Sequence, residues 1–237
     1  MNQSYPIRIN KYLAQNNYST RTGADELIKK GFVFINGRKA ILGDQVREND
    51  EVIVSQENIK KEYVYYAYNK KVGISTNKDS GAKDILSVTK FPTTVFPIGR
   101  LDKDSHGLII MTNDGRVTDR LLSPIYTHDK EYVVKVEPNI SDKFLELIQN
   151  GVHFDKFVSK KCSAWRSGNK KNTFHIILTE GKKRQIRRMC EALHHKVIDL
   201  KRIRILNIEL GKISDGEYKE IKGKELNDFL KLLKLIN

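Results

Sequence analysis

The segment from Val95 to Gly115 constrains the fold more than any other part of the sequence. Two apolar stretches flank a polar loop that contains Arg100, Leu101 and Asp102, and the second stretch begins at Gly107. This pattern predicts two strands joined by a loop, an arrangement that can hold a reactive carboxylate on a rigid support. It is equally typical of an ordinary strand–loop–strand unit whose charged residues are simply solvated.

The charge balance narrows the class of binding partner. The chain has 237 residues, of which 43 are Lys or Arg and 29 are Asp or Glu, giving a formal net charge of +14. Such an excess favours a polyanion, either a nucleic acid or an anionic membrane surface. No apolar run approaches the roughly 18–20 residues that span a bilayer, and Met1–Pro6 lacks the apolar core of a signal peptide. Nucleic acid is therefore the expected partner, without membrane association.

The cysteine content argues against a structural metal or a disulfide framework. Only Cys162 and Cys190 occur, outside any Cys-x-x-Cys pair, which fits a reducing cytosol. His194 and His195 follow Cys190 closely, but side chains of adjacent residues diverge and no further ligand cluster completes a site. We expect no metal.

Residues 8–54 read as a self-contained module. Ile9, Tyr12 and Leu13 share one face of a short helix, and Ser19-Thr20 supplies the N-cap of a second helix that stops at Gly31. A strand at 32–35, a hairpin turn at Asn36-Gly37 and a returning strand at 52–54 follow. The core of such a small unit is thin, so attachment to a larger domain is expected.

Basic side chains concentrate in this module. Residues 1–40 contain seven basic and two acidic residues, a pattern that is also typical of a solvated helix surface. The order of helices, the Arg-Ile-Asn-Lys-Tyr-Leu opening and the Val-Phe-Ile-Asn-Gly hairpin resemble the alpha-L RNA-binding module over nearly all of residues 7–54. The resemblance implies RNA contacts from Arg8, Lys11, Arg21 and Lys30.

The remainder of the chain predicts an α+β fold. We assign residues 1–57 to the module, 58–62 to a linker and 63–237 to a second domain. Expected strands lie near 63–68, 107–112, 131–137, 173–179 and 204–210, and expected helices lie near 115–123, 141–150 and 183–194. This order lacks the regular strand–helix repeat of a doubly wound fold, so a mixed, largely antiparallel sheet is expected.

Three segments of this second domain carry a family resemblance. Gly-Arg-Leu-Asp-x-x-Ser-x-Gly-Leu at 99–108, followed by Thr-Asn-Asp-Gly at 112–115, resembles the signature of the RsuA/RluB/RluE/RluF class of pseudouridine synthases. Lys-Glu-Tyr at 130–132 and the segment 180–190 resemble two further parts of that class, and Arg-Gln-Ile-Arg-Arg-Met-Cys is most similar to its RluF branch. Beyond about residue 222 the chain resembles nothing specific.

The resemblance implies roles for three residues. Asp102 is the expected catalytic aspartate, Tyr132 the expected active-site tyrosine, and Arg187 the expected ion-pair partner of Asp102. Residues 180–204 contain nine basic and three acidic residues, an excess that suits a phosphate track but also an exposed helix face. We expect further RNA contacts from the basic residues of the loop and of this segment: Arg100, Lys103, Lys182, Lys183, Arg184 and Arg188.

The implied reaction detaches uracil from C1′ of ribose and rejoins it through C5. It involves no redox change and the sequence has no Gly-x-Gly-x-x-Gly, so no cofactor is expected. An ionised carboxylate must act as nucleophile or as base, and the sequence leaves both routes open. A buried aromatic ring can stack on the detached base, which has to be flipped out of its stack first.

The resemblance to the RluF branch implies large-subunit ribosomal RNA as substrate, in the bacterial cytoplasm and without an obligate protein partner. Small-subunit ribosomal RNA, transfer RNA and a catalytically silent RNA-binding protein are the alternatives. Residues 102–107 also fit the opening Asp-x-Asp-x-x-Gly of a calcium loop. His106 at the fifth position and Asn113 at the twelfth, where a bidentate glutamate is required, argue against calcium.

Overall fold

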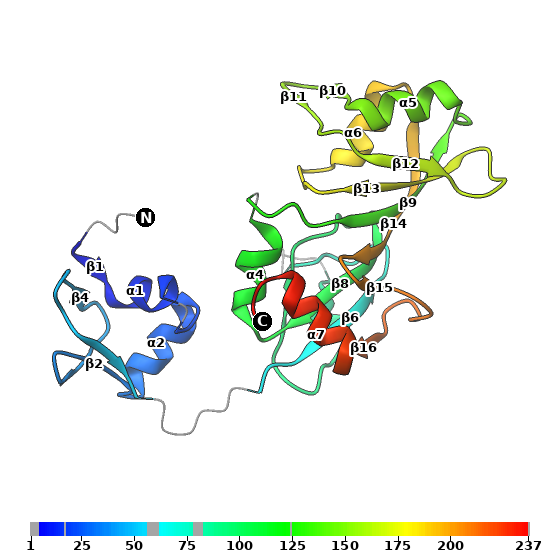
Figure 1. Ribbon diagram of the computed structural model, residues 1–237. Helices are drawn as coiled ribbons and strands as arrows, with labels where there is room; N and C mark the ends of the chain where they lie inside the picture. The colour runs from blue at the N-terminus through cyan, green and yellow to red at the C-terminus, as the bar shows by residue number, and fades with distance from the viewer. Residues whose placement is uncertain (1–4, 17, 56–61, 78–82, 124, 237) are drawn as a thin grey trace. The chain divides into compact units, whose positions relative to one another are not determined.

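The computed structural model describes residues 5–16, 18–55, 62–77, 83–123 and 125–236. The chain divides into two compact units, Met1–Glu62 and Tyr63–Asn237, called here the N-terminal and C-terminal units (Figure 1). The expected boundary after residue 57 and most of the expected linker 58–62 lie outside the described residues. None of the described helices has the length and hydrophobicity needed to cross a bilayer.

The N-terminal unit contains the two helices and the hairpin that the sequence predicts. The Thr20 side chain caps α2 by accepting a hydrogen bond from the backbone N–H of Gly23. Asn36 and Gly37 both have positive φ, as the expected hairpin turn requires. The elements are β1 (Ile7–Arg8), α1 (Ile9–Gln15), α2 (Arg21–Lys29), β2 (Val33–Ile35), β3 (Arg38–Lys39), β4 (Gln45–Val46) and β5 (Val52–Val54).

One core lies inside this unit. Ile9 and Leu13 of α1 and Ala24 and Ile28 of α2 are spaced four residues apart, so each pair lies on one helix face, and all four are buried against Val33 of β2. The strands form two small sheets, β1 with β4 and β3-β2-β5.

The C-terminal unit is built on a nine-stranded sheet. Its main order is β12-β13-β9-β14-β8-β6-β16, with β7 paired to β8 and β15 paired to β14. Every pairing is antiparallel except that of β14 with β8, so the expected mixed, largely antiparallel α+β fold is confirmed. The strands are β6 (Tyr65–Lys70), β7 (Phe96–Ile98), β8 (His106–Thr112), β9 (Lys130–Glu137), β12 (Ser163–Arg166), β13 (Thr173–Leu178), β14 (Lys196–Ile205), β15 (Ile208–Glu209) and β16 (Tyr218–Glu220).

Helices gather at both ends of this sheet (Figure 1). At one end α5, α6 and the hairpin β10–β11 cover β9, β12 and β13, and at the other end lie α4 and α7. Their bounds are α3 (Ile85–Val88), α4 (Gly115–Leu122), α5 (Asp142–Asn150), β10 (His153–Phe154), β11 (Phe157–Val158), α6 (Gln185–Ala192) and α7 (Gly223–Leu232).

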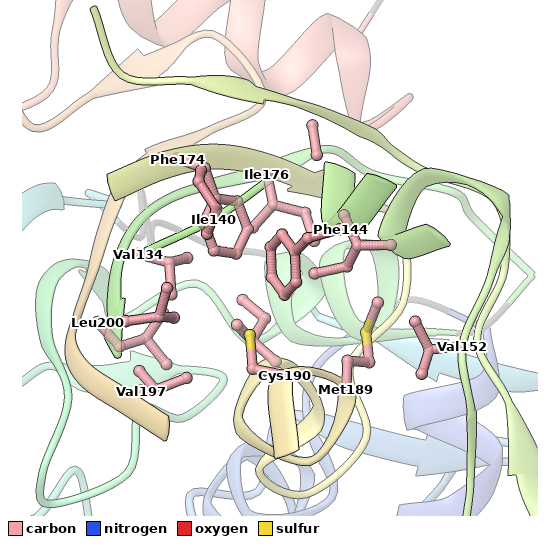
Figure 2. Close-up of a cluster of buried hydrophobic side chains, with 14 of the residues drawn as sticks. Val134, Ile140, Phe144, Val152, Phe174, Ile176, Met189, Cys190, Val197 and Leu200 are labelled. Atoms are coloured by element: carbon pink, nitrogen blue, oxygen red, sulfur yellow. The ribbon is translucent and has the colours of Figure 1, made fainter. Parts of the chain in front are cut away.

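Three buried clusters fill the C-terminal unit. In the first, Phe144 of α5, Phe174 of β13 and Met189 of α6 converge, and the two rings meet edge to face at 5.3 Å (Figure 2). The second packs Leu108 and Ile110 of β8 against α4 and α7. The third, on the other face of β8, packs Ile109 and Met111 against Tyr66 and Tyr68 of β6. Because β8 is buried on both faces, its sequence is continuously apolar rather than alternating.

The structure corrects one expectation near the C-terminus and assigns a helix to the segment for which the sequence predicted no element. The strand expected at 204–210 is instead the longer β14, followed by a turn at Leu206-Asn207 and the short β15. Register shifts between Val197 and Asp199 and between Arg202 and Arg204 break the alternation that would have marked β14 in the sequence. The segment beyond residue 222 forms α7, which closes the second cluster with Phe229 and Leu230.

Candidate active site

The expected strand–loop–strand unit is present around Asp102. Strands β7 and β8 are paired, with Phe96 opposite Thr112 and Ile98 opposite Ile110, and residues 99–105 form the loop between them, called here the Asp102 loop. The backbone N–H of Ser105 donates to the carbonyl of Asp102 at 3.0 Å, which closes a tight turn. The Asp102 side chain remains 36% exposed, so a substrate can reach it.

A second segment, residues 71–76, is hydrogen-bonded to the Asp102 loop. The Thr76 hydroxyl accepts from the backbone N–H of Leu101 at 3.0 Å and donates to the Leu101 carbonyl at 2.8 Å. The Gly73 N–H donates to the Lys103 carbonyl at 2.7 Å, and the Lys70 ammonium donates to the Ile74 carbonyl at 2.6 Å. These bonds fix the backbone on both sides of Asp102.

Four strands bring Tyr132 to the same face of the sheet as this loop. Lys70 of β6, Gly107 of β8, Arg202 of β14 and Tyr132 of β9 are register partners in one row across the sheet. Tyr132 is half-buried and packs against both the first and the third buried cluster. Tyr132 therefore lies between the end of the sheet that α5 and α6 cover and the part of the sheet that carries the Asp102 loop.

The crossing of β8 and β14 in this row requires a glycine. A Cβ atom at Gly107 would lie 2.2 Å from the carbonyl oxygen of Arg202, and φ at this residue is +102°. The absence of a side chain lets the two backbones approach. Arg202 then extends over β8 and donates from Nε to the Leu108 carbonyl at 2.7 Å.

Two arginines at the start of α6 contact the Asp102 loop. Arg184 is the N-cap residue of α6 and has φ of 52°, and its guanidinium binds both carboxylate oxygens of Asp104 at 3.1 and 3.0 Å. Arg187 donates from Nη2 to the Asp104 carbonyl at 2.9 Å and to the Ser105 hydroxyl at 3.2 Å. Its Nε lies 3.3 Å from the Asp104 carboxylate, an ionic contact without hydrogen-bond alignment.

This geometry corrects the expected ion pair between Arg187 and Asp102. Arg184 makes the ion pair with Asp102, at 4.0 Å, while Arg187 pairs with Asp104. The physical reason is that the Arg187 guanidinium is already held by the Asp104 and Ser105 acceptors and by the Val197 carbonyl at 3.2 Å. In the sequence, Asp104 was noticed only as part of the Asp-x-Asp spacing at 102–104, which matches the opening of a calcium loop but not the rest of that motif.

Buried cations that the sequence did not reveal as site residues also lie near the Asp102 loop. Burial lowers the pKa of Lys70 to about 8; the Asp104 and Asp102 charges oppose this shift and Arg202 reinforces it. Burial also lowers the pKa of Lys130 to about 8, again with help from Arg202. The Nη2 atom of Arg202 is buried and has no hydrogen-bond partner within the described parts of the chain.

Asp104 carries negative charge among these cations. Partial burial raises the pKa of Asp104, but the Arg184 hydrogen bonds and the Arg187 and Arg184 charges outweigh it and hold that pKa below its usual value. The Asp104 carboxylate is therefore ionised at neutral pH and neutralises part of the local positive charge.

The residues predicted to bind RNA lie on both units. Arg8, Lys11, Arg21 and Lys30 are exposed on the N-terminal unit. On the C-terminal unit, the exposed residues are Arg100, Lys103, Lys182, Lys183 and Arg184. Arg188 is half-buried, pairs with Asp155 and lies over the Phe154 ring, and Lys182 lies over the Phe157 ring. Both side chains are thus anchored on the β10–β11 hairpin.

Comparison with known proteins identifies the same two parts of the chain. Residues 64–192 match the RNA pseudouridylate synthase family and residues 7–52 match the S4 domain family. The dual-specificity RNA pseudouridine synthase RluF of Escherichia coli O6:H1 is 40% identical over 232 residues, which cover 96% of this chain and 79% of that protein. The ribosomal large subunit pseudouridine synthase B of Bacillus subtilis (strain 168) is 35% identical, covering 92% of this chain and 93% of that one.

The fold agrees with these sequence relationships. A crystal structure of a pseudouridylate synthase matches with a TM-score of 0.69 and 26% identity, covering 96% of this chain and 99% of the other. The chain therefore belongs to the RNA pseudouridylate synthase family, in the RsuA class near RluF, and it is an RNA pseudouridine synthase with an N-terminal S4 domain.

Proposed function

We propose that this enzyme isomerises a specific uridine of large-subunit ribosomal RNA in the cytoplasm, with Asp102 as the reacting carboxylate. The observation that carries the proposal is the placement of Asp102 on a loop fixed by Thr76 and Gly73, with its carboxylate exposed and one arginine at 4.0 Å. The names of two relatives, a dual-specificity synthase and a large-subunit synthase, support RNA of the large ribosomal subunit as the first substrate to test.

The chemistry assigns a task to each of the three proposed site residues. The C1′–N1 bond breaks, uracil turns, a C1′–C5 bond forms, and C5 gives up a proton while N1 gains one. Asp102 acts at the sugar or the base as nucleophile or as general base. The Tyr132 ring can stack on the detached uracil and hold it while it turns. Arg187, together with Arg184, keeps positive charge beside the loop.

Access to C1′ and C5 requires that the target nucleotide leave its stack. We assign binding of the phosphates on either side of such a nucleotide to the exposed basic residues around the loop, Arg100 and Lys103, and before α6, Lys182 and Lys183. The S4 domain offers a second set of phosphate contacts through Arg8, Lys11, Arg21 and Lys30. Phosphate contacts position an RNA without reading its sequence.

The test compares ribosomal RNA from cells that contain or lack the gene, with pseudouridines mapped by carbodiimide-blocked primer extension. One site in large-subunit RNA should disappear on deletion, return with the wild-type gene and remain absent with Asp102→Asn. Asp142→Asn is the matched control, because it also removes a carboxylate paired with an arginine, at an exposed position in the first turn of helix α5. If the pseudouridine lost on deletion lies only in small-subunit or transfer RNA, the proposed substrate is wrong. If Asp102→Asn restores the pseudouridine, the proposed role of Asp102 is wrong.

A further inference from the structure

The Asp102 loop contains two carboxylates with different surroundings. Asp104 receives two hydrogen bonds from Arg184 and an ionic contact from Arg187. Asp102, two residues earlier, has one ion pair at the longer distance of 4.0 Å, and within the described residues its carboxylate accepts no hydrogen bond. Arg184 thus makes close hydrogen bonds to Asp104 and only a longer ionic contact to Asp102.

The tight contact also joins two elements that are far apart in the sequence. Arg184 and Asp104 are 80 residues apart, and Arg187 and Ser105 are 82 apart. Arg184 occupies the left-handed region at the N-cap of α6 and makes no side-chain cap bond to the helix. Its side chain is therefore free to hold the loop, and the bidentate bond fixes the plane of the guanidinium.

The unequal division has a chemical consequence. A carboxylate that reacts as nucleophile or base needs a free lone pair, and a bidentate arginine would occupy lone pairs on both oxygens. Arg184, at 4.0 Å, still places positive charge beside the Asp102 carboxylate. Asp104 provides the tight partner, so that Arg184 stays close to Asp102 without covering it.

We propose that Asp104 is a positioning residue for the isomerisation: its carboxylate holds Arg184 and Arg187 at the Asp102 loop, so that positive charge stays beside Asp102 and its carboxylate is left uncovered. The inference rests on the proposed role of Asp102. In the absence of Asp104, Arg184 becomes free to bind Asp102 directly or to move into solvent, and either change slows the chemical step. Asp104 itself does not touch the reacting atoms in this assignment.

The test uses the full-length protein and the RNA that the wild-type enzyme modifies. Single-turnover rates are measured with enzyme in excess, for Asp104→Asn, Asp104→Glu and the control Asp142→Asn, and RNA affinity is measured at two salt concentrations. We expect Asp104→Asn to lower the rate at saturating enzyme by about tenfold or more, with RNA affinity within about threefold of wild type and an unchanged salt dependence. Asp104→Glu should recover part of that loss, and Asp142→Asn should match wild type.

A double-mutant cycle identifies the route of the effect. If Asp104 acts through Arg184, the loss caused by Asp104→Asn should be smaller in an Arg184→Gln background than in wild type. If the rate loss of the double variant equals the product of the two single-variant losses, the two residues act independently and the proposal is overturned. A wild-type rate for Asp104→Asn at saturating enzyme, with only weakened RNA binding, would overturn it as well, because it would make Asp104 a binding or purely structural residue.

Two controls separate this proposal from its premise. Urea unfolding of each variant shows whether a slower rate reflects loss of folded protein, and rates are compared only for variants that are folded under the assay conditions. If the wild-type enzyme is active and Asp102→Asn is active too, the proposed role of Asp102 fails, and with it the premise of this inference. If Asp102→Asn is inactive and Asp104→Asn behaves like wild type, only the inference about Asp104 fails.

Discussion

The hydroxyl group of Thr76 bonds both backbone polar groups of Leu101, the residue that precedes Asp102. Thr76 and Leu101 are both buried, so neither bond can be replaced by one to water. A single side chain from another segment therefore sets the backbone geometry at the proposed catalytic residue.

Replacing Thr76 with valine should test this relationship, because valine keeps the shape and removes the hydroxyl. Two buried backbone groups lose their partner, so we expect the free energy of unfolding to fall by roughly 2–4 kcal/mol. The rate of pseudouridine formation should fall as well, measured on folded protein. Thr76→Ser retains the hydroxyl and should stay near wild type, and an active Thr76→Val would show that the loop is held by its other bonds.

Gly107→Ala should be among the most destabilising single changes. The added Cβ meets the Arg202 backbone at 2.2 and 2.8 Å and φ is +102°, so strands β8 and β14 must separate. A loss of about 4 kcal/mol or more is expected, seen as insoluble protein or early urea unfolding. Gly168→Ala is the matched control, since φ is +54° and no atom lies within 4 Å; it should cost about 1 kcal/mol. Equal effects of the two would contradict the close crossing.

Lys70 should make stability depend on pH in the alkaline range. Its pKa is lowered from 10.5 to about 8 by burial, so below pH 8 both the folded and the unfolded states carry the proton. Between pH 8 and 10.5 the folded state releases it first, the unfolded state binds more protons, and the free energy of unfolding rises with pH. The burial cost is thus full below pH 8 and relieved above it.

The variant Lys70→Met removes this contribution. The stability of wild type relative to Lys70→Met should increase by on the order of 2 kcal/mol from pH 7.5 to 10, measured by urea unfolding at each pH. Lys71→Met, at the exposed neighbouring position, is the control and should show no such trend. If the difference in free energy of unfolding between wild type and Lys70→Met does not change with pH, the Lys70 ammonium is not desolvated.

Tyr132→Phe should separate the ring of Tyr132 from its hydroxyl. Within the described residues the hydroxyl makes no hydrogen bond, while the ring packs on two clusters, so the variant should unfold within about 0.5 kcal/mol of wild type. We expect the loss of the hydroxyl to lower the rate at saturating RNA, while the retained stacking ring leaves KM little changed. Tyr132→Ala removes the ring as well and should lose both stability and activity. A fully active Tyr132→Phe would limit the role of Tyr132 to stacking.

The C-terminal unit should fold without the S4 domain. Each unit has its own buried core, so a chain of residues 63–237 is expected to unfold cooperatively. It should modify RNA at high concentration, with a raised KM and a shallower salt dependence, by about 0.7–0.9 in the log–log slope per lost phosphate contact. Unchanged affinity and salt dependence with lost chemistry would show that the S4 domain shapes the active site instead.

Local sequence signals predicted most elements because the physical causes are local. The Thr20 cap, the Asn36-Gly37 turn and the apolar faces of α1 and α2 depend on residues within four positions of each other. Strand β14 escaped prediction because both of its register shifts lie in its pairing with β9, a strand about 65 residues earlier in the sequence. Helix α7 lacked a side-chain cap and a family motif to mark it.

Short-range patterns and composition were sufficient to predict the two-domain α+β organisation, the loop that carries Asp102 and the excess of basic residues. The pairing of Arg184 and Arg187 with Asp104 and the burial of Lys70 and Arg202 beside the site follow from long-range packing. The arginine contacts join residues 80 to 94 positions apart. They form because β14 crosses β8 at Gly107 and α6 begins against the Asp102 loop, and a charged residue gives no local sign of which distant partner it will meet.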